Sequence, residues 1–230
     1  MIGIIGAMDV EVEGIKLVVE NSSERIISGV TFVSGTIEGR EVVVAKCGIG
    51  KVNAAICTEA MILAFNPALI INVGVAGSLS PELSIGDIVV ADNVCQHDFD
   101  TTPVGDKRGL IAEVNLINIP ADQDAYEHLA SCVQACGINY QIGTIASGDI
   151  FVADSDTKDF IVAEFSALAC EMEGASIGQV CWINRVPFTV LRAISDSANE
   201  DSHMDYPEFC RLAARRSIMV IDEFLKTYDK

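Results

Sequence analysis

Residues 167–196 read ALACEMEGASIGQVCWINRVPFTVLRAISD, and this stretch decides what kind of fold the chain can adopt. It holds two apolar runs, 167–170 and 186–195, separated by a segment with helical character. Continuous apolar runs of this kind are typical of strands that are buried on both faces of a sheet. We therefore expect strand, helix and strand in succession, which is the pattern of an α/β fold.

Both apolar runs lead into acidic residues. The first is followed by Glu173, and the second contains Arg192 and ends at Asp196. Ligands of open α/β sheets lie beyond the carboxyl ends of the strands, so we expect these three side chains to reach one cleft. Acids at strand ends are also common as solvated turn residues. Arg192 favours a site, because a guanidinium inside an apolar strand needs a carboxylate partner, and strand alternation puts it on the same side as Asp196.

The rest of the chain continues the alternation of strands and helices. Further strands are predicted at 1–6, 68–73, 88–92 and 140–147, and helices at 9–20, 51–65, 122–136, 154–165 and 205–227. Two β-like stretches, 25–34 and 41–47, predict a hairpin, which makes the sheet mixed. The sequence has no linker and no low-complexity break, so we expect residues 1–230 to form a single α/β domain.

The amino-acid composition indicates which kinds of partner the protein is not expected to bind. Half of the 230 residues are hydrophobic (50%), and 33 acidic residues against 15 basic ones give a net charge of −18. This excess of acid argues against a nucleic acid or an anionic membrane as partner. No apolar run approaches the ~18 residues of a membrane span. Residues 1–6 lack the basic start of a signal peptide and are better explained as a first strand.

The cysteines indicate the compartment. None of the eight forms a CxxC pair, and Cys132 and Cys136 have no companion His/Cys pair to complete a zinc site. We therefore expect free thiols in a reducing cytoplasm and no bound metal.

Several loops carry residues suited to binding a ligand. The small residues at 74–78 would let a flat ligand press against the backbone, and Phe151 follows a strand end, where it suits stacking on a base. Gly48 and Gly50 resemble a phosphate loop but lack its full pattern, which leaves close approach to a ligand or to a neighbouring strand. The long irregular stretch 93–120 is expected to be functional or interfacial; within it, His97 is either catalytic or structural.

With these pieces in place, the chain resembles the 5′-methylthioadenosine/S-adenosylhomocysteine nucleosidases of the purine nucleoside phosphorylase superfamily. The resemblance spans nearly the whole chain and rests on the motifs IGIIGAMDVEVE, CGIGKVNAA, INVGVAGSL, GDIVVAD, QHDFDTTP, SGDIFV, CEMEGASIGQVC, VLRAISDSA and SHMDYPEF. It implies a three-layer sandwich around a mixed, largely parallel central sheet. It also implies hydrolysis of an N-glycosidic bond, without a metal or an organic cofactor.

The resemblance also assigns roles to residues. Glu11 corresponds to the residue that activates water, and Asp196 to the acid that protonates the purine. Glu173 corresponds to the carboxylate that binds the ribose diol, and Arg192 to the residue that helps to fix the water and the glutamates. The other implied substrate contacts are Met8, Ile49 and Tyr206 for the 5′-thio substituent, Gly77, Phe151 and Val152 for adenine, and Val75, Met172 and Ser195 elsewhere in the site.

Four positions depart from the family's pattern. Val75 replaces a small hydroxyl residue near the ribose and the water. Val104 and Asp106 stand where two aromatic residues usually reach into the neighbouring subunit's 5′ pocket, and Tyr206 stands where phenylalanine is usual. These departures bear on the preferred 5′ substituent.

The chemistry of the reaction calls for the same residue types. Breaking an N-glycosidic bond requires an acid that protonates the departing base and a carboxylate that holds a water at the anomeric carbon. A third carboxylate can accept both ribose hydroxyl protons. Asp196, Glu11 and Glu173 supply these groups, and Asp196 would have to keep a proton near neutral pH in a closed site.

Three alternatives remain beside this interpretation. A nucleoside phosphorylase would need an anion pocket, for which the chain offers Arg192 but no hydroxyl at Val75. A futalosine-type nucleoside hydrolase would use the same residues. A non-catalytic nucleoside-binding or storage protein should have lost one of the acids. The many apolar segments and the 97–109 loop further predict a homodimer with twofold symmetry.

Overall fold

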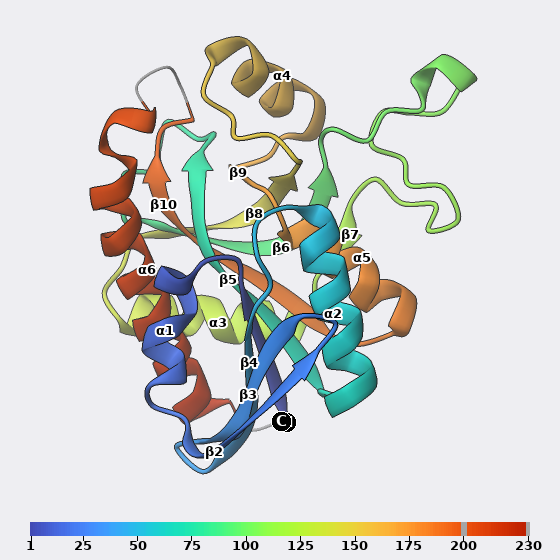
Figure 1. The fold of residues 1–230 in the computed structure, drawn as a ribbon. Coiled ribbons are helices and arrows are strands. Elements are labelled where there is room, and N and C mark those ends of the chain that lie inside the picture. Colours follow the sequence, from blue (N-terminus) through green and yellow to red (C-terminus); the bar gives the residue numbers. More distant parts are fainter. Residues whose placement is uncertain (199–201, 229–230) are drawn as a thin grey trace.

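Two fully buried strands, β5 (Leu69–Ser78) and β10 (Phe188–Asp196), lie parallel to each other within the central sheet (Figure 1). Both arise from the continuous apolar runs that the sequence predicts as strands. The computed structural model describes residues 1–198 and 202–228, and of residues 202–207 it describes the backbone alone. Within these ranges ten strands form one sheet.

The sheet mixes parallel and antiparallel pairs. Its order is β10-β6-β8-β9-β5-β1-β4-β3-β2, with β7 paired to β6. The remaining strands are β1 (Ile2–Gly6), β2 (Glu20–Ile27), β3 (Val30–Ile37), β4 (Arg40–Lys46), β6 (Ile88–Gln96), β7 (Ile119–Pro120), β8 (Tyr140–Ser147) and β9 (Ala169–Glu171). Parallel pairings join β4, β1, β5 and β10, and also β6, β8 and β9. Because β10 pairs with both β5 and β6, the strands β5, β9, β8, β6 and β10 close into a ring.

Helices cover both faces of the sheet and complete three layers (Figure 1). They are α1 (Asp9–Lys16), α2 (Lys51–Phe65), α3 (Gln123–Ala135), α4 (Ser155–Phe165), α5 (Gly174–Asn184) and α6 (Ser202–Thr227). The helices α1, α3 and α6 pack on one face, and α2 and α5 pack on the other. The helix α4 packs over a smaller third cluster through Ile161 and Phe165. The predicted α/β sandwich is confirmed.

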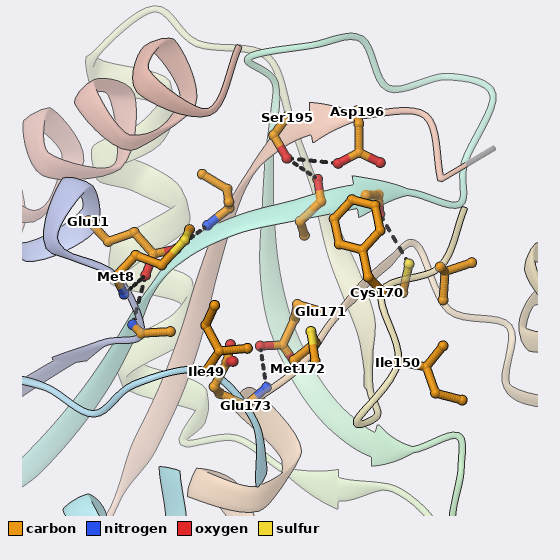
Figure 2. A pocket seen from close by; sticks show the side chains of 16 residues that line it. Met8, Glu11, Ile49, Ile150, Cys170, Glu171, Met172, Glu173, Ser195 and Asp196 are labelled. Carbon is orange, nitrogen blue, oxygen red and sulfur yellow. Dashed lines mark hydrogen bonds between the residues drawn. The ribbon is translucent and has the colours of Figure 1, made fainter. Parts of the chain in front are cut away.

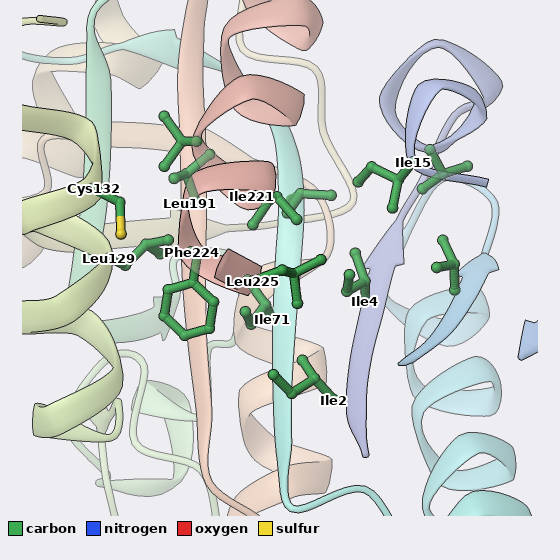
Figure 3. Close-up of a cluster of buried hydrophobic side chains, with 14 of the residues drawn as sticks. Ile2, Ile4, Ile15, Ile71, Leu129, Cys132, Leu191, Ile221, Phe224 and Leu225 are labelled. Atoms are coloured by element: carbon green, nitrogen blue, oxygen red, sulfur yellow. The ribbon is translucent and has the colours of Figure 1, made fainter. Parts of the chain in front are cut away.

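The larger core cluster lies between the sheet and the helices α1, α3 and α6 (Figure 3). Leu129 of α3 and Phe224 of α6 are fully buried there and face Leu191 of β10. Apolar residues recur at helical spacing in α3, whose start is capped because Asp122 accepts a hydrogen bond from the Ala125 N–H at 3.0 Å. This packing holds β10 in place at the centre of the sheet.

The N-terminal hairpins differ from the prediction. One strand was expected over 25–34, but this expectation is wrong, because a turn at Ser28 and Gly29 separates β2 from β3. Both turn residues have positive φ, 51° and 79°, the pattern of the two-residue turn that matches the twist of paired strands. A second turn of this kind, at Glu38 and Gly39, joins β3 to β4.

Several element boundaries also differ from those predicted. The helix expected over 9–20 ends at Lys16, and the last helix begins at Ser202 instead of residue 205. The strands β5 and β6 extend four or more residues beyond their apolar runs, to Ser78 and Gln96. Each extended strand therefore carries small or polar residues at its end, and those of β5 reach the site described below.

The cysteines are free thiols, as predicted: seven are buried and Cys136 is half-buried. Among the helices within the described residues, none is long and apolar enough to cross a membrane.

Candidate active site

A cavity lies where the carboxyl-terminal halves of β5 and β10 meet β9 and the starts of α1 and α5 (Figure 2). Its walls are formed by Ala7, Met8, Glu11, Ile49, Val75, Ala76, Gly77, Ile150, Phe151, Val152, Cys170, Glu171, Met172, Glu173, Ser195 and Asp196. Of the thirteen site residues predicted from the sequence, eleven line this cavity and Arg192 does not. The side chain of Tyr206 lies outside the described residues.

Arg192 lies behind the cavity wall, and its side chain is 1% exposed. Its Nε donates to Glu171 Oε2 at 3.1 Å, and its Nη2 donates both to that oxygen and to Asn72 Oδ1, the latter at 2.6 Å. The same Nη2 lies 3.6 Å from Glu173 Oε2. Burial alone would lower the pKa of Arg192, but these carboxylates keep it above its ordinary value. The expected carboxylate partner of Arg192 is therefore Glu171.

Glu171 is not among the site residues predicted from the sequence. Its two oxygens accept the Gly174 N–H at 2.9 and 2.8 Å and the Glu173 N–H at 3.1 Å, and Oε1 also accepts the Ser147 hydroxyl. Glu171 thus satisfies the free N–H groups at the start of α5 while it pairs with Arg192. The sequence does place Glu171 directly after the apolar run 167–170, but the prediction selected Glu173, two residues further on.

Glu11 is held rigidly at the start of α1. Its Oε2 accepts the N–H groups of Ala7 and Met8 at 2.7 and 2.8 Å, and its Oε1 accepts the Val75 N–H at 3.0 Å. Burial raises the pKa of Glu11, although Arg192 and the backbone N–H groups oppose the rise. A buried carboxylate with a raised pKa is a better proton acceptor than an exposed one, which suits a general base.

Gly74 makes room for this arrangement. A Cβ at this position would lie 2.5 Å from Glu11 Oε1 and 2.7 Å from Arg192 Nη1. A side chain there would clash with both groups, so the missing Cβ lets the carboxylate and the guanidinium approach each other.

The carboxyl group of Glu173 has a strongly raised pKa. Burial first, and then the nearby charge of Glu171, raise its pKa from 4.5 to about 7, against the opposing effect of Arg192. Its Oε1 accepts the Gly50 N–H at 2.9 Å, which connects it to the loop before α2. Glu173 therefore changes charge close to neutral pH.

Asp196 ends β10 on a different wall of the cavity from Glu11 (Figure 2). Its Oδ2 accepts the Ser195 hydroxyl and its Oδ1 accepts the Ala198 N–H, both at 2.9 Å. A bulge between Ile194 and Asp196 interrupts the strand alternation, so that both Ser195 and Asp196 line the cavity. A Cβ on Gly77 would lie 2.9 Å from Asp196 Oδ1, which is too close for a side chain. Glycine at this position therefore leaves room for the Asp196 carboxylate beside the backbone of β5.

The strands bring Glu171, Glu173 and Asp196 together in an arrangement that differs from the predicted one. Both apolar runs were expected to end at the same edge of an open sheet. Instead, β10 runs parallel to β5, whereas β9 runs antiparallel to β5 and pairs with its last residues, Gly77 and Ser78. Glu171 and Glu173 reach the cavity because β9 lies across the end of β5.

Other residues considered from the sequence lie outside the cavity. His97 is buried, does not line the cavity, and has a pKa lowered by that burial, which fits the structural alternative. Val104 is 81% exposed, and neither it nor Asp106 lines the cavity. Within the described part of the chain, no group of three or more His, Cys, Asp or Glu side chains could hold a metal ion.

Known proteins match this chain along nearly its whole length, which includes the residues that line the cavity. The family model described as the phosphorylase superfamily matches residues 1–226. The 5′-methylthioadenosine/S-adenosylhomocysteine nucleosidase of Staphylococcus haemolyticus is 40% identical over 227 residues, 98% of this chain and 99% of the relative. The structure of the corresponding enzyme from Neisseria meningitidis, in complex with methylthio-immucillin-A, has a TM-score of 0.95 and 33% identity, with 98% of each chain covered. Futalosine hydrolase of Helicobacter pylori has a TM-score of 0.92 and 37% identity, covering 96% of this chain and 95% of that one.

The buried pair of Arg192 and Glu171 leads to a prediction about stability. Glu171→Gln leaves a buried guanidinium without its main partner, and we expect a loss of about 3–5 kcal/mol in the free energy of unfolding. Chemical denaturation measures this loss. The control is Asp222→Asn, which breaks the exposed pair of Asp222 with Lys226 and should cost only about 0.3–0.5 kcal/mol. Equal losses in the two variants would contradict the prediction.

Proposed function

The chain belongs to the phosphorylase superfamily, and we propose that it hydrolyses the N-glycosidic bond of 5′-thio-substituted adenosines. The substrates are 5′-methylthioadenosine and S-adenosylhomocysteine, and the products are adenine and the thioribose. Relatives with this activity align along nearly the full chain. The observation that carries the proposal is a cavity lined by four carboxyl groups, Glu11, Glu171, Glu173 and Asp196, with the guanidinium of Arg192 already paired behind its wall.

This charge distribution favours water over phosphate as the nucleophile. A phosphorylase must bind a dianion, which requires cationic or amide groups that are free to face it. Here Arg192 is paired with Glu171 and Asn72, and the backbone N–H groups of Ala7, Met8 and Val75 are already bound to Glu11. A phosphate would therefore meet carboxylates, whereas a neutral water would find an acceptor for its proton.

The two catalytic acids act on opposite ends of the bond. Asp196 gives a proton to the purine as the bond between the anomeric carbon and the ring nitrogen breaks, so adenine leaves as a neutral base. Glu11 accepts a proton from a water whose oxygen then bonds to the anomeric carbon. Three backbone N–H groups hold the Glu11 carboxylate in one orientation before the substrate arrives.

The other residues of the cavity bind the three parts of the substrate. Glu173 accepts the ribose hydroxyl protons, and Arg192 holds the glutamates in position. The base lies against Gly77, Phe151 and Val152. The apolar side chains of Met8, Ile49 and Met172 form a wall for the thio substituent, with Tyr206 proposed to join them. Val75 and Ser195 complete the site beside the ribose and the leaving base.

Futalosine hydrolysis is the second candidate function. It is favoured by the fold likeness to futalosine hydrolase, and the same three acids would serve it. A non-catalytic binding protein is a weaker alternative because Glu11, Glu173 and Asp196 all line the cavity.

The decisive experiment is an assay of adenine release from 5′-methylthioadenosine in phosphate-free buffer. We expect turnover that added phosphate does not accelerate, with free methylthioribose as the second product. Turnover that requires phosphate would identify a phosphorylase. Release of base from futalosine, but not from methylthioadenosine, would favour the second candidate.

The role proposed for Asp196 predicts the behaviour of Asp196→Asn. The amide cannot protonate the purine, and we expect kcat to fall about 10²–10⁴-fold. Nucleoside binding should persist, since the contacts to the ribose and the 5′ group are unchanged. Calorimetric titration with methylthioadenosine, beside steady-state kinetics, measures both effects. A variant that turns over within a few-fold of the wild type would exclude Asp196 as the acid.

The raised pKa of Glu173 predicts how nucleoside binding depends on pH. The ionised carboxylate accepts the ribose hydroxyls, so affinity should rise as the pH increases to about 7 and level off above it. Titration of the Asp196→Asn variant with methylthioadenosine at several pH values tests this without turnover. Adenine, which has no ribose, is the control ligand and should not follow this ionisation. Adding Glu173→Gln should abolish the pH dependence; if the dependence survives, another group causes it.

We also propose that the enzyme is a cytoplasmic homodimer. Its free thiols suit a reducing compartment. An apolar stripe on α2, formed by Val52, Ile56 and Leu63, is exposed to solvent, and Ile183 of α5 is exposed as well. The spacing of four and seven residues places the three α2 side chains on one face of the helix. Exposed apolar patches of this kind mark protein–protein interfaces.

Light scattering tests the assembly. The wild type should have the mass of two chains at micromolar concentration, and Val52→Asp should shift it towards one chain. The control Leu17→Asp changes another exposed apolar side chain, directly after α1, and should leave the mass unchanged. A fully active wild-type monomer would refute the dimer.

A further inference from the structure

Three charged residues outside the cavity connect two segments that line it, at Ile49 and at 150–152, with the segment after β6. Lys51 is the first residue of α2, Asp98 lies two residues beyond β6, and Asp149 lies two residues beyond β8. None of the three lines the cavity. They lie far apart in the sequence, and the hydrogen bonds between them are what bring the three loops together.

These residues form a closed triangle of hydrogen bonds. The Lys51 N–H donates to Asp149 Oδ1 at 2.8 Å, and the Lys51 Nζ donates to Asp98 Oδ1 at 2.6 Å. The third side is closed by the Asp149 N–H, which donates to Asp98 Oδ2 at 2.9 Å. Each residue is thus bound to both of the others, so the loss of one bond loosens the whole set.

The ion pair of the triangle is shielded from solvent. The side chains of Lys51 and Asp98 are 18% and 17% exposed. Burial alone would raise the pKa of Asp98, but its hydrogen bonds from the Lys51 side chain and the Asp149 N–H hold the pKa below its ordinary value. Asp98 is therefore ionised at neutral pH, and the pair is weakened less by salt than an exposed pair would be.

Lys51 itself is anchored to the body of the fold. Its carbonyl accepts the Ser176 hydroxyl of α5 at 2.7 Å, and its Nζ also donates to Gln96 Oε1 at 3.2 Å. The preceding residue, Gly50, donates its N–H to Glu173. The start of α2 is thus fixed to the rest of the fold. Hydrogen bonds to it can therefore hold a segment that has no regular secondary structure.

That less regular segment is the loop from residue 148 to residue 152. It has no helix or strand and carries Phe151 and Val152, which line the cavity. The two triangle bonds made by Asp149 tie this loop to α2 and to the segment after β6. The position of the loop relative to the opposite wall therefore depends on Asp149 and its two partners.

We propose that Lys51, Asp98 and Asp149 are positioning residues that fix the 148–152 loop and thereby set the affinity of the site for the adenine ring. The inference rests on the proposed function, which assigns Phe151 and Val152 to the base. The triangle touches neither the substrate nor Glu11 and Asp196. It acts on binding of the base through the loop, and not on the chemical step.

The test uses Lys51→Met and Asp98→Asn in the full chain. Each variant should raise the dissociation constant for adenine, measured by calorimetry, about tenfold, which corresponds to about 1.4 kcal/mol. KM for methylthioadenosine should rise in parallel while kcat stays near the wild-type value. The double variant should be no worse than either single one, because the three residues act as a unit.

Two further variants separate positioning from a general loss of structure. Lys51→Arg keeps the charge and should restore most of the adenine affinity. Lys226→Met removes a lysine from an exposed pair on α6 and is the matched control, for which wild-type affinity is expected. Circular dichroism melting of each variant monitors stability separately from binding.

The proposal is overturned if both Lys51→Met and Asp98→Asn bind adenine within twofold of the wild type, whether or not their melting temperatures fall. Adenine titration needs no turnover, so it remains informative for a protein that fails to hydrolyse methylthioadenosine. Failure of the proposed function would appear in the wild-type assay, and failure of this inference would appear in the variants' affinity for adenine.

Discussion

A single buried guanidinium holds the carboxyl groups of the site together. Arg192 is paired with Glu171 and lies close to Glu173 and Glu11, so one positive charge faces three acids. Burying such a cation is costly unless its partners are well placed, and removing any of them leaves charge uncompensated. The excess of acid over base also has a chemical effect. Burial raises the pKa of Glu173 most, and the neighbouring charge of Glu171 raises it further against the lowering that Arg192 causes.

Backbone N–H groups near the starts of three helices hold further carboxylates in position. Backbone N–H groups at the first turn of a helix have no partner within the helix and carry partial positive charge. Glu171 is bound in this way at α5 and Asp149 at α2, and Glu11 accepts the N–H groups of Ala7 and Met8 directly before α1. The N–H dipoles at these helix starts therefore orient carboxylates in addition to those that Arg192 holds. This division explains why Arg192 can lie behind the wall, while the carboxyl groups that would meet the substrate remain at the surface of the cavity.

The sequence was sufficient for most of the helices and strands, and for Glu173 and Asp196, because continuous apolar runs and the acids that follow them depend on local chemistry. Most of the other residues that line the cavity were implied by the family resemblance. It was insufficient where distant segments decide the outcome. Glu171 could not be distinguished from Glu173 as the partner of Arg192, since that choice depends on the antiparallel placement of β9 across β5. The bulge before Asp196 arises in the pairing of β10 with β5 and leaves no local signal. The turn at Ser28 and Gly29 was missed for the opposite reason, because its signal is local but was absorbed into a long β-like run.

The closed ring of strands has a consequence for how the protein is made. The strand β5 is complete at Ser78, but β10, which pairs along most of its length, begins only at Phe188. During synthesis, one edge of this strand, which is fully buried in the finished fold, therefore stays unpaired while most of the intervening chain is added. Folding that depends on contacts so distant in sequence is slow, and an open apolar edge invites pairing with other chains. The ring of strands can therefore close only after β10, its last strand, has emerged from the ribosome.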